Sequence, residues 1–177
     1  MALLRHTLVI LVEDKPGVLN RVSSLFRRRS FNIESIAVGH SELLGFSRMV
    51  VVVDGANTAV EQVRKQLDKV IEVVKVTDIS YERVVAREIA LIKVESSPTT
   101  RSEIMQITDI FRASILDVSS ESIIVEVTGD EDKIDSLIEL LREFNIIELV
   151  RTGRIAMPRG TIGNNRKQGQ VKRKKSE

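Results

Sequence analysis

The apolar residues of this chain change their spacing at several points, and each change marks the edge of an expected strand or helix. Residues 8–12 form a continuous apolar run whose length suits a buried strand. Beyond Gly17 the apolar residues recur at helical spacing, at Val18, Val22, Leu25 and Phe26. The pattern predicts a strand, a turn at residues 13–17 and a helix.

This order of elements occurs twice along the chain, which indicates an internal repeat. The first copy is expected as a strand at 5–12, a helix at 16–29, strands at 31–39 and 46–54, a helix at 57–70 and a strand at 72–80. The second copy is expected as a strand at 87–94, a helix with Ile104 and Ile107 on its apolar face, strands at 114–119 and 122–128, a helix with Ile134 and Leu137, and a strand from about Ile146. Two βαββαβ units are therefore predicted.

A βαββαβ unit has few ways to fold, because each crossover is right-handed and both helices cover the same face of the sheet. The expected class is α+β, with two tandem ferredoxin-like units, each an antiparallel four-stranded sheet with two helices on one face. We expect the first domain at residues 1–80, the second at 81–160, and a basic disordered tail at 161–177. The fold hosts many functions and assigns none by itself.

The charge is distributed unevenly along the chain. Its formal net charge is +2, but residues 151–177 hold nine basic side chains against one acidic one, so residues 1–150 carry a net charge of −6. The chain has no cysteine, which excludes disulfides and thiolate chemistry. No apolar run is long enough to cross a bilayer, and the N-terminus lacks the features of a signal peptide. We expect a cytoplasmic protein without membrane contact.

The candidate catalytic and metal-binding residues form no coherent set. The two histidines, His6 and His40, are far apart in the sequence, and we expect His6 on the surface of its strand. The loop 39–45 has two glycines but lacks the lysine of a phosphate loop, so it is interpreted as a hairpin. The acidic run 130–132 opens a helix, where capping explains it. Neither a catalytic site nor a metal site is predicted.

RNA recognition motifs share this order of elements, which makes nucleic-acid binding a candidate function. Those motifs stack bases on aromatic side chains of their central strands. The corresponding segments, 6–12 and 47–53, contain no aromatic residue. Together with the acidic charge of residues 1–150, this argues against a nucleic-acid partner.

The turn at residues 13–17 allows two interpretations. In the first, Asp14, Pro16 and Gly17 only connect a strand to a helix, with Asp14 as a possible cap. In the second, the free amides at the start of the helix bind a small anion such as a carboxylate, since Gly17 has no side chain to block the approach. Spacing alone does not decide between them.

The segment 8–32 resembles an ACT domain, a small ligand-sensing module. The similarity extends further, through the motifs Phe-Asn-Ile-Glu-Ser at 31–35, Arg-Glu at 87–88 and Arg-Thr-Gly-Arg at 151–154. Over about residues 6–160 the chain resembles the small, regulatory subunits of acetolactate synthase, also called acetohydroxyacid synthase. The resemblance implies a non-catalytic subunit that binds and activates a large catalytic subunit and confers feedback inhibition by L-valine, or another branched-chain amino acid.

The same resemblance implies that this chain binds no cofactor, because thiamine diphosphate and magnesium belong to the large subunit. It also implies an effector site between two ACT domains of a homodimer. In that site the amides of Gly17, Val18 and Leu19 hold the effector carboxylate. Asn32 and the backbone near Ile33, from the other chain, contact its ammonium group, with Asp14 as a further polar partner.

Alternatives remain open at this point. A free-standing ACT-type sensor of amino acids acting on another enzyme or on a transcription regulator is one, although no helix-turn-helix segment is left over. A small enzyme on the same fold is another, but the sequence offers it no site. The second unit lacks a Pro-Gly turn, so we expect no second effector site there; dimer formation and contact with the large subunit both fit it.

Overall fold

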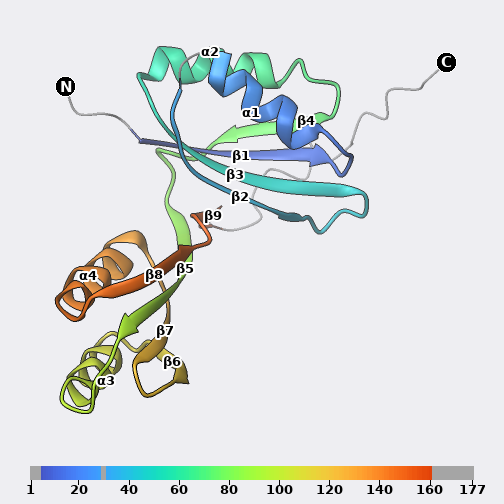
Figure 1. Ribbon diagram of the computed structural model, residues 1–177. Coiled ribbons are helices and arrows are strands. Elements are labelled where there is room, and N and C mark those ends of the chain that lie inside the picture. Colours follow the sequence, from blue (N-terminus) through green and yellow to red (C-terminus); the bar gives the residue numbers. More distant parts are fainter. Residues whose placement is uncertain (1–4, 29–30, 161–177) are drawn as a thin grey trace. The chain divides into compact units, whose positions relative to one another are not determined.

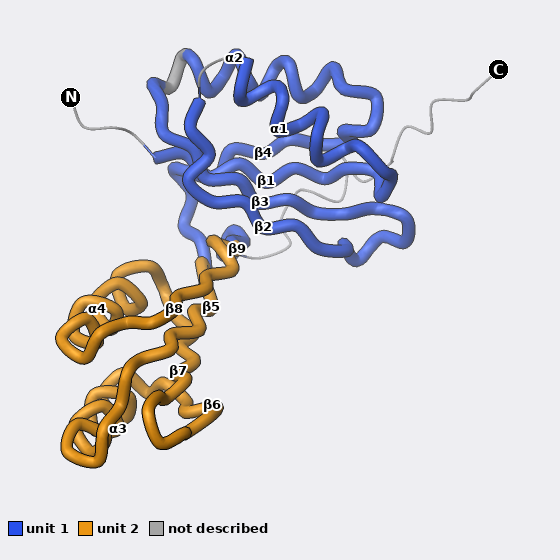
Figure 2. Tube along the Cα trace, in the orientation of Figure 1, with its two compact units in different colours: residues 1–85, 156–177 blue, residues 86–155 orange. Residues whose placement is uncertain are grey.

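The structure is a computed structural model that describes residues 5–28 and 31–160 (Figure 1). The predicted tail, 161–177, lies outside the described residues. The chain divides into two compact units, Met1–Val85 with the segment from Ala156 onward, and Ala86–Ile155 (Figure 2). This differs from the predicted boundaries, 1–80 and 81–160, because the chain returns to the first unit after residue 155.

The first unit has the predicted order of elements. They are β1 (Arg5–Glu13), α1 (Val18–Arg28), β2 (Ile33–His40), β3 (Phe46–Asp54), α2 (Asn57–Leu67) and β4 (Val73–Asp78). The strands form one antiparallel sheet in the order β2-β3-β1-β4, and both helices cover the same face (Figure 1). The prediction of a ferredoxin-like unit is confirmed.

The core of this unit is built from alternate side chains of its two central strands. Leu8 and Ile10 of β1 and Val51 and Val53 of β3 have no exposed surface, and they pack with Phe26 and other apolar residues of the helices. Because side chains of a strand alternate between faces, the apolar positions two residues apart all face the helices. The buried face therefore fixes the register of β1.

The second unit repeats the same architecture. The elements from β5 onward are β5 (Val84–Glu95), α3 (Arg101–Ile110), β6 (Ser114–Val118), β7 (Ser122–Gly129), α4 (Glu131–Leu141), the 3-10 turn η1 (Arg142–Phe144), β8 (Ile146–Arg151) and β9 (Ile155–Pro158). The boundaries with the first unit fall within β5 and within β9. The sheet order is β6-β7-β5-β8, and β9 also pairs with β5. The sequence pattern did not predict β9, a strand of only four residues.

The repeat extends to irregularities and single hydrogen bonds. The pairing of β1 with β4 shifts register at Leu11/Val12, and that of β5 with β8 shifts at Lys93/Val94. Beyond each shift, the Glu13 amide donates to the Glu72 carbonyl at 2.8 Å, and the Glu95 amide to the Asn145 carbonyl at 3.0 Å. The two units therefore align at Val12 and Val94.

Six residues before Val12 and Val94, this alignment pairs two buried polar residues, His6 and Glu88. His6 is only 1% exposed, so the prediction of a surface histidine was wrong. It lies two residues before Leu8 on β1 and so faces the helices, where its Nδ1 is 3.4 Å from an oxygen of Asp78. Glu88 is 6% exposed and accepts hydrogen bonds from Arg151 at 2.6 and 3.1 Å.

Asp78 and Arg151 also occupy equivalent places, since Asp78 pairs with Leu8 and Arg151 pairs with Ala90. The two units thus place a polar pair at the same point with the basic and acidic partners exchanged. Arg151 makes a further bond of 2.7 Å to Asp135 of α4, so it joins β5, β8 and a helix.

The overall charge is not shared equally by the units. Residues 86–155 contain fourteen acidic and eight basic side chains, whereas residues 1–85 contain ten acidic and twelve basic ones. The negative charge that the sequence placed on the folded part therefore belongs to the second unit.

Replacement of Arg151 by methionine should destabilise the second unit by about 3 kcal/mol, because it leaves Glu88 buried without its counter-charge. The matched control is the double variant Glu88→Leu/Arg151→Met, which removes both charges and should recover most of the loss. Denaturant unfolding of the purified chain measures both. Equal destabilisation by the single and double variants would contradict the role given to the pair.

Gly55→Ala should also destabilise the fold, because a Cβ at this position would overlap the ring of Phe31, whose Cδ1 would lie 3.1 Å away. We expect a loss of about 1–3 kcal/mol. Gly39→Ala is the control, since a Cβ there meets no atom within 4 Å. Equal unfolding midpoints for the two variants would show that Phe31 moves away without cost.

Candidate functional site

The turn after β1 is held at one end of the first sheet by backbone hydrogen bonds. The amide of Asp14 donates to the carbonyl of Gly45 at 2.9 Å, and that of Lys15 donates to Glu13 at 3.0 Å. Gly17 has a φ of +83°, in the left-handed region that favours glycine. This conformation delays the start of α1 to Val18, two residues beyond the predicted start at residue 16.

The start of α1 presents backbone donors to solvent. The first helical bond runs from the Arg21 amide to the Gly17 carbonyl at 3.0 Å, and the Val18 amide makes only a long contact of 3.4 Å with Lys15. Within the ranges 5–28 and 31–160, the amides of Gly17, Leu19 and Asn20 donate to no backbone carbonyl. The first turn of α1 has no acidic residue, which suits an approaching anion.

The charged side chains around the turn are engaged with one another. Lys15 Nζ lies 2.7 Å from Glu13 Oε2, and Arg21 is paired with Glu72. A backbone hydrogen bond to its carboxylate and the bond from Arg21 hold the pKa of Glu72 below its usual range. Lys15 and Arg21 are thus paired with carboxylates, whereas the amides of Gly17, Leu19 and Asn20 have no backbone acceptor within the described residues.

Asp14 makes a contact that the sequence did not predict. Its Oδ2 lies 3.3 Å from Nδ1 of His40, at the end of β2. Both side chains are well exposed, at 47% and 85%. The Asp14 side chain therefore lies against the β2–β3 hairpin beside the turn. Residues 14 and 40 are too far apart in the sequence for local spacing to predict this contact.

The other predicted site residues, Asn32 and Ile33, lie at the opposite end of the sheet. In the shared register of three strands, His40 is level with Ser47 and Val12, whereas Ile33 is level with Val53 and His6. Six strand residues separate these two rows, which is about 20 Å. One chain therefore brings Asp14, Gly17, Val18 and Leu19 together but keeps Asn32 and Ile33 away from them.

Asn32 is exposed and borders a shallow open depression. The depression is lined by Ser23, Arg27, Phe31, Asn32 and Ile33. Its lining combines apolar side chains with hydroxyl, amide and guanidinium groups.

The corresponding turn of the second unit is closed by its own side chains. The Ser97 amide donates to Thr100 Oγ1 at 3.0 Å, and the Thr100 amide lies 3.3 Å from Ser97 Oγ. The guanidinium of Arg101 donates to the Ser119 carbonyl at 2.7 Å. The Arg101 amide, which aligns with the open amide of Leu19, donates to the Ser97 carbonyl at 3.0 Å.

Among the described residues, Ser80, His6 and Asp78 form a cluster of residue types that suit catalysis, but its geometry is unsuitable. Ser80 Oγ and Asp78 Oδ2 both lie 3.4 Å from Nδ1 of His6. A nucleophile relay requires the hydroxyl and the carboxylate on opposite ring nitrogens. This cluster is therefore structural.

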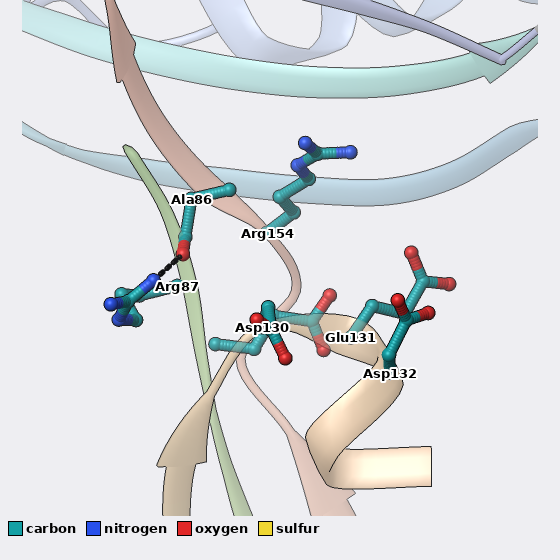
Figure 3. Close-up of a pocket in the computed structure, with 7 residues that line it drawn as sticks. Ala86, Arg87, Asp130, Glu131, Asp132 and Arg154 are labelled. Carbon is teal, nitrogen blue, oxygen red and sulfur yellow. Dashed lines mark hydrogen bonds between the residues drawn. The ribbon is translucent and has the colours of Figure 1, made fainter. Parts of the chain in front are cut away.

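A cavity of about 190 Å³ in the second unit is lined at the start of α4 by Asp130, Glu131 and Asp132 (Figure 3). Asp130 accepts a hydrogen bond of 3.1 Å from the Lys133 amide, which confirms its predicted capping role.

Across the described part of the chain, no three histidine or acidic side chains are grouped to hold a metal ion. Among the helices in that part, none has the length and apolar character needed to span a bilayer.

Comparison with known proteins identifies both units. Residues 8–75 match the family described as "AHAS small subunit-like ACT domain", and residues 87–160 match "Small subunit of acetolactate synthase". The chain is 55% identical over 157 residues to a probable acetolactate synthase small subunit of Archaeoglobus fulgidus, covering 89% of this chain and 98% of the relative. It is 52% identical over 160 residues to the acetolactate synthase small subunit of Bacillus subtilis, covering 89% and 92%.

A solved structure agrees with these matches. The crystal structure of the acetolactate synthase small subunit from Thermotoga maritima superposes with a TM-score of 0.83 at 46% identity, covering 89% of this chain and 99% of that one. The chain therefore belongs to the family of acetolactate synthase small subunits, with an ACT domain as its first unit.

Proposed function

We propose that this chain binds the large catalytic subunit of acetolactate synthase, raises its activity and makes it sensitive to feedback by L-valine. The similar proteins are named as small subunits of that enzyme, which implies a catalytic partner. The thiamine diphosphate and magnesium of the reaction belong to the partner in this proposal.

The observation that carries the proposal is the open turn at Gly17. An amino-acid effector needs donors for its carboxylate, and within residues 5–28 and 31–160 the amides of Gly17 and Leu19, at the positive end of a helix, donate to no backbone carbonyl. Leu19 is 49% exposed beside them and offers apolar contact to an aliphatic side chain. The turn therefore suits the carboxylate end of a branched-chain amino acid.

The separation of Asn32 from the turn supports a site shared between two chains. β2 is an edge strand of the first sheet, so a second copy can add its own β2 there. A two-fold axis between antiparallel edges reverses one sheet relative to the other. The turn of one chain then lies towards the Asn32 end of its partner, and the two halves of the site come together.

Such a site connects effector binding to the geometry of the dimer. A ligand that contacts the turn of one chain and Asn32 of the other binds best to one arrangement of the two. It therefore shifts the population towards that arrangement. The activity of the catalytic subunit changes if that subunit binds the other arrangement of the dimer more tightly.

Gly17→Asp should abolish inhibition by L-valine in the complex reconstituted with the large subunit, because the new carboxylate repels that of the effector. We expect the half-inhibitory concentration to rise at least about tenfold, and activation without valine to stay within about twofold. Gly17→Asn is the matched control, since asparagine tolerates a positive φ as aspartate does but adds no charge. Unchanged inhibition of the Gly17→Asp complex would refute the proposed carboxylate site.

Val38→Lys should weaken the homodimer and, with it, the response to valine. Val38 is 50% exposed on the edge strand β2, where a lysine opposes pairing of two edges. Val74→Lys on the other edge strand, β4, is the control, at 38% exposure. Sedimentation velocity and valine inhibition are measured for both. A Val38→Lys chain that stays dimeric and inhibited would place the dimer contact elsewhere.

A further inference from the structure

Three loops of the first unit lie side by side at the end of its sheet that carries the Gly17 turn (Figure 1). They are the turn itself, the β2–β3 hairpin at 41–45 and the segment 68–72 before β4. The Asp14 amide joins the turn to the hairpin by a hydrogen bond of 2.9 Å to the Gly45 carbonyl. The Glu13 amide joins it to the segment before β4 by a bond of 2.8 Å to the Glu72 carbonyl. The three loops therefore form one surface around the start of α1.

This surface exposes large aliphatic side chains. Leu44 in the hairpin is 101% exposed and Ile71 before β4 is 84% exposed, while Leu43 and Leu19 are 38% and 49% exposed. None of the four belongs to the core cluster of this unit. A single exposed leucine is ordinary, but several aliphatic side chains gathered at one end of a sheet are typical of an interaction site. We call these four residues the loop patch.

The hairpin that carries Leu44 is closed by its own hydrogen bonds. The Ser41 amide donates to the Phe46 carbonyl at 2.9 Å, and the Phe46 amide donates to the Leu43 carbonyl at 3.1 Å. The Leu43 amide also donates to Ser41 Oγ, at 3.1 Å. Leu44 is thus presented to solvent on an ordered loop, so its burial by a partner requires little further ordering of the backbone.

The charged side chains around the loop patch neutralise one another. Three ion pairs of the described residues lie in or beside these loops: Lys15 with Glu13, Arg21 with Glu72, and Arg48 with Glu42. Aliphatic side chains within a rim of polar groups are the composition of a protein–protein contact. Because the paired charges cancel, they give no attraction to nucleic acid or to an anionic membrane. The loop patch therefore fits an apolar surface of another protein.

The second unit lacks these aliphatic residues at the equivalent place. Its corresponding turn, hairpin and segment before β8 are residues 96–100, 119–121 and 142–145, and they contain no leucine, isoleucine or valine. Phe144, their one aromatic residue, packs against the core. Since the two units share their architecture, the fold itself does not require aliphatic residues in these loops. The loop patch and the open turn occur together in the first unit.

We propose that the loop patch is the surface through which this chain contacts an apolar surface of the large catalytic subunit. The inference rests on the proposed function, which supplies that partner and assigns the second copy of this chain to the edge of β2. Leu19 belongs both to the loop patch and to the open turn, so an effector bound at the turn lies within the contact with the large subunit. Feedback then requires no signal between the two units, because the ligand changes the contact surface directly.

Leu44→Ser and Ile71→Ser test the loop patch in the complex reconstituted with the large subunit. Ile110→Ser is the matched control, since Ile110 is 76% exposed at the end of α3 in the second unit. The concentration of the chain that gives half-maximal activation is measured for each variant. Sedimentation velocity and thermal stabilisation by L-valine are measured on the isolated chains, because neither involves the large subunit.

Each variant of the loop patch should need at least about tenfold more chain for half-maximal activation, because it removes an aliphatic anchor from the contact. The control should need the same concentration as the unaltered chain. Both variants of the loop patch should keep the sedimentation coefficient of the unaltered chain and its stabilisation by L-valine.

Unchanged activation by both variants, or equal weakening by the control, would overturn the proposal. Loss of the homodimer would also overturn it, since the loop patch would then contact a second copy, and loss of stabilisation by L-valine would show that the loop patch contacts the effector instead. If the unaltered chain does not activate the large subunit, the proposed function itself fails.

Discussion

The shared register of β3 with its two neighbours is the constraint on which the first unit depends. β3 pairs antiparallel with β1 on one side and with β2 on the other, and its alternate side chains Met49, Val51 and Val53 are buried in the core. A slip of one residue would turn these side chains to the other face of the sheet. The register therefore fixes the Gly17 turn at one end of the sheet and Asn32 at the other, and this separation underlies the proposal of a site shared by two chains.

The second unit has the same arrangement of strands and helices as the first but lacks its open turn. It keeps the register shift, the backbone hydrogen bond beyond that shift and the buried polar pair, in which the acidic and basic residue types are exchanged. What differs is the turn, where Ser97 and Thr100 bond to each other's backbone amides and hydroxyls. Local side-chain chemistry, and not topology, distinguishes a turn that can receive a ligand from one that is already filled.

Much of the architecture followed from periodicity, because the apolar spacing of each strand and helix reflects the face that it buries. The twelve predicted elements and the antiparallel sheets are confirmed, as is the cap at Asp130. The prediction of a surface His6 was wrong because residues two apart on a strand share a face, and His6 lies two residues before the buried Leu8. β9 is short and mostly exposed, so no apolar pattern marks it. The distance between Gly17 and Asn32 depends on pairing across strands, which local spacing does not contain.

The central claim, an effector site built from two chains, is tested most directly by mixing two inactive variants. Gly17→Asp damages the turn and Asn32→Ala damages the second strand, so each homodimer should fail to respond to L-valine. In a mixed dimer, one of the two sites combines the intact turn of one chain with the intact Asn32 of the other. Co-expression should therefore restore part of the stabilisation by L-valine in thermal unfolding. If the mixed dimer forms and shows no response, both halves of the site belong to one chain and the account is wrong.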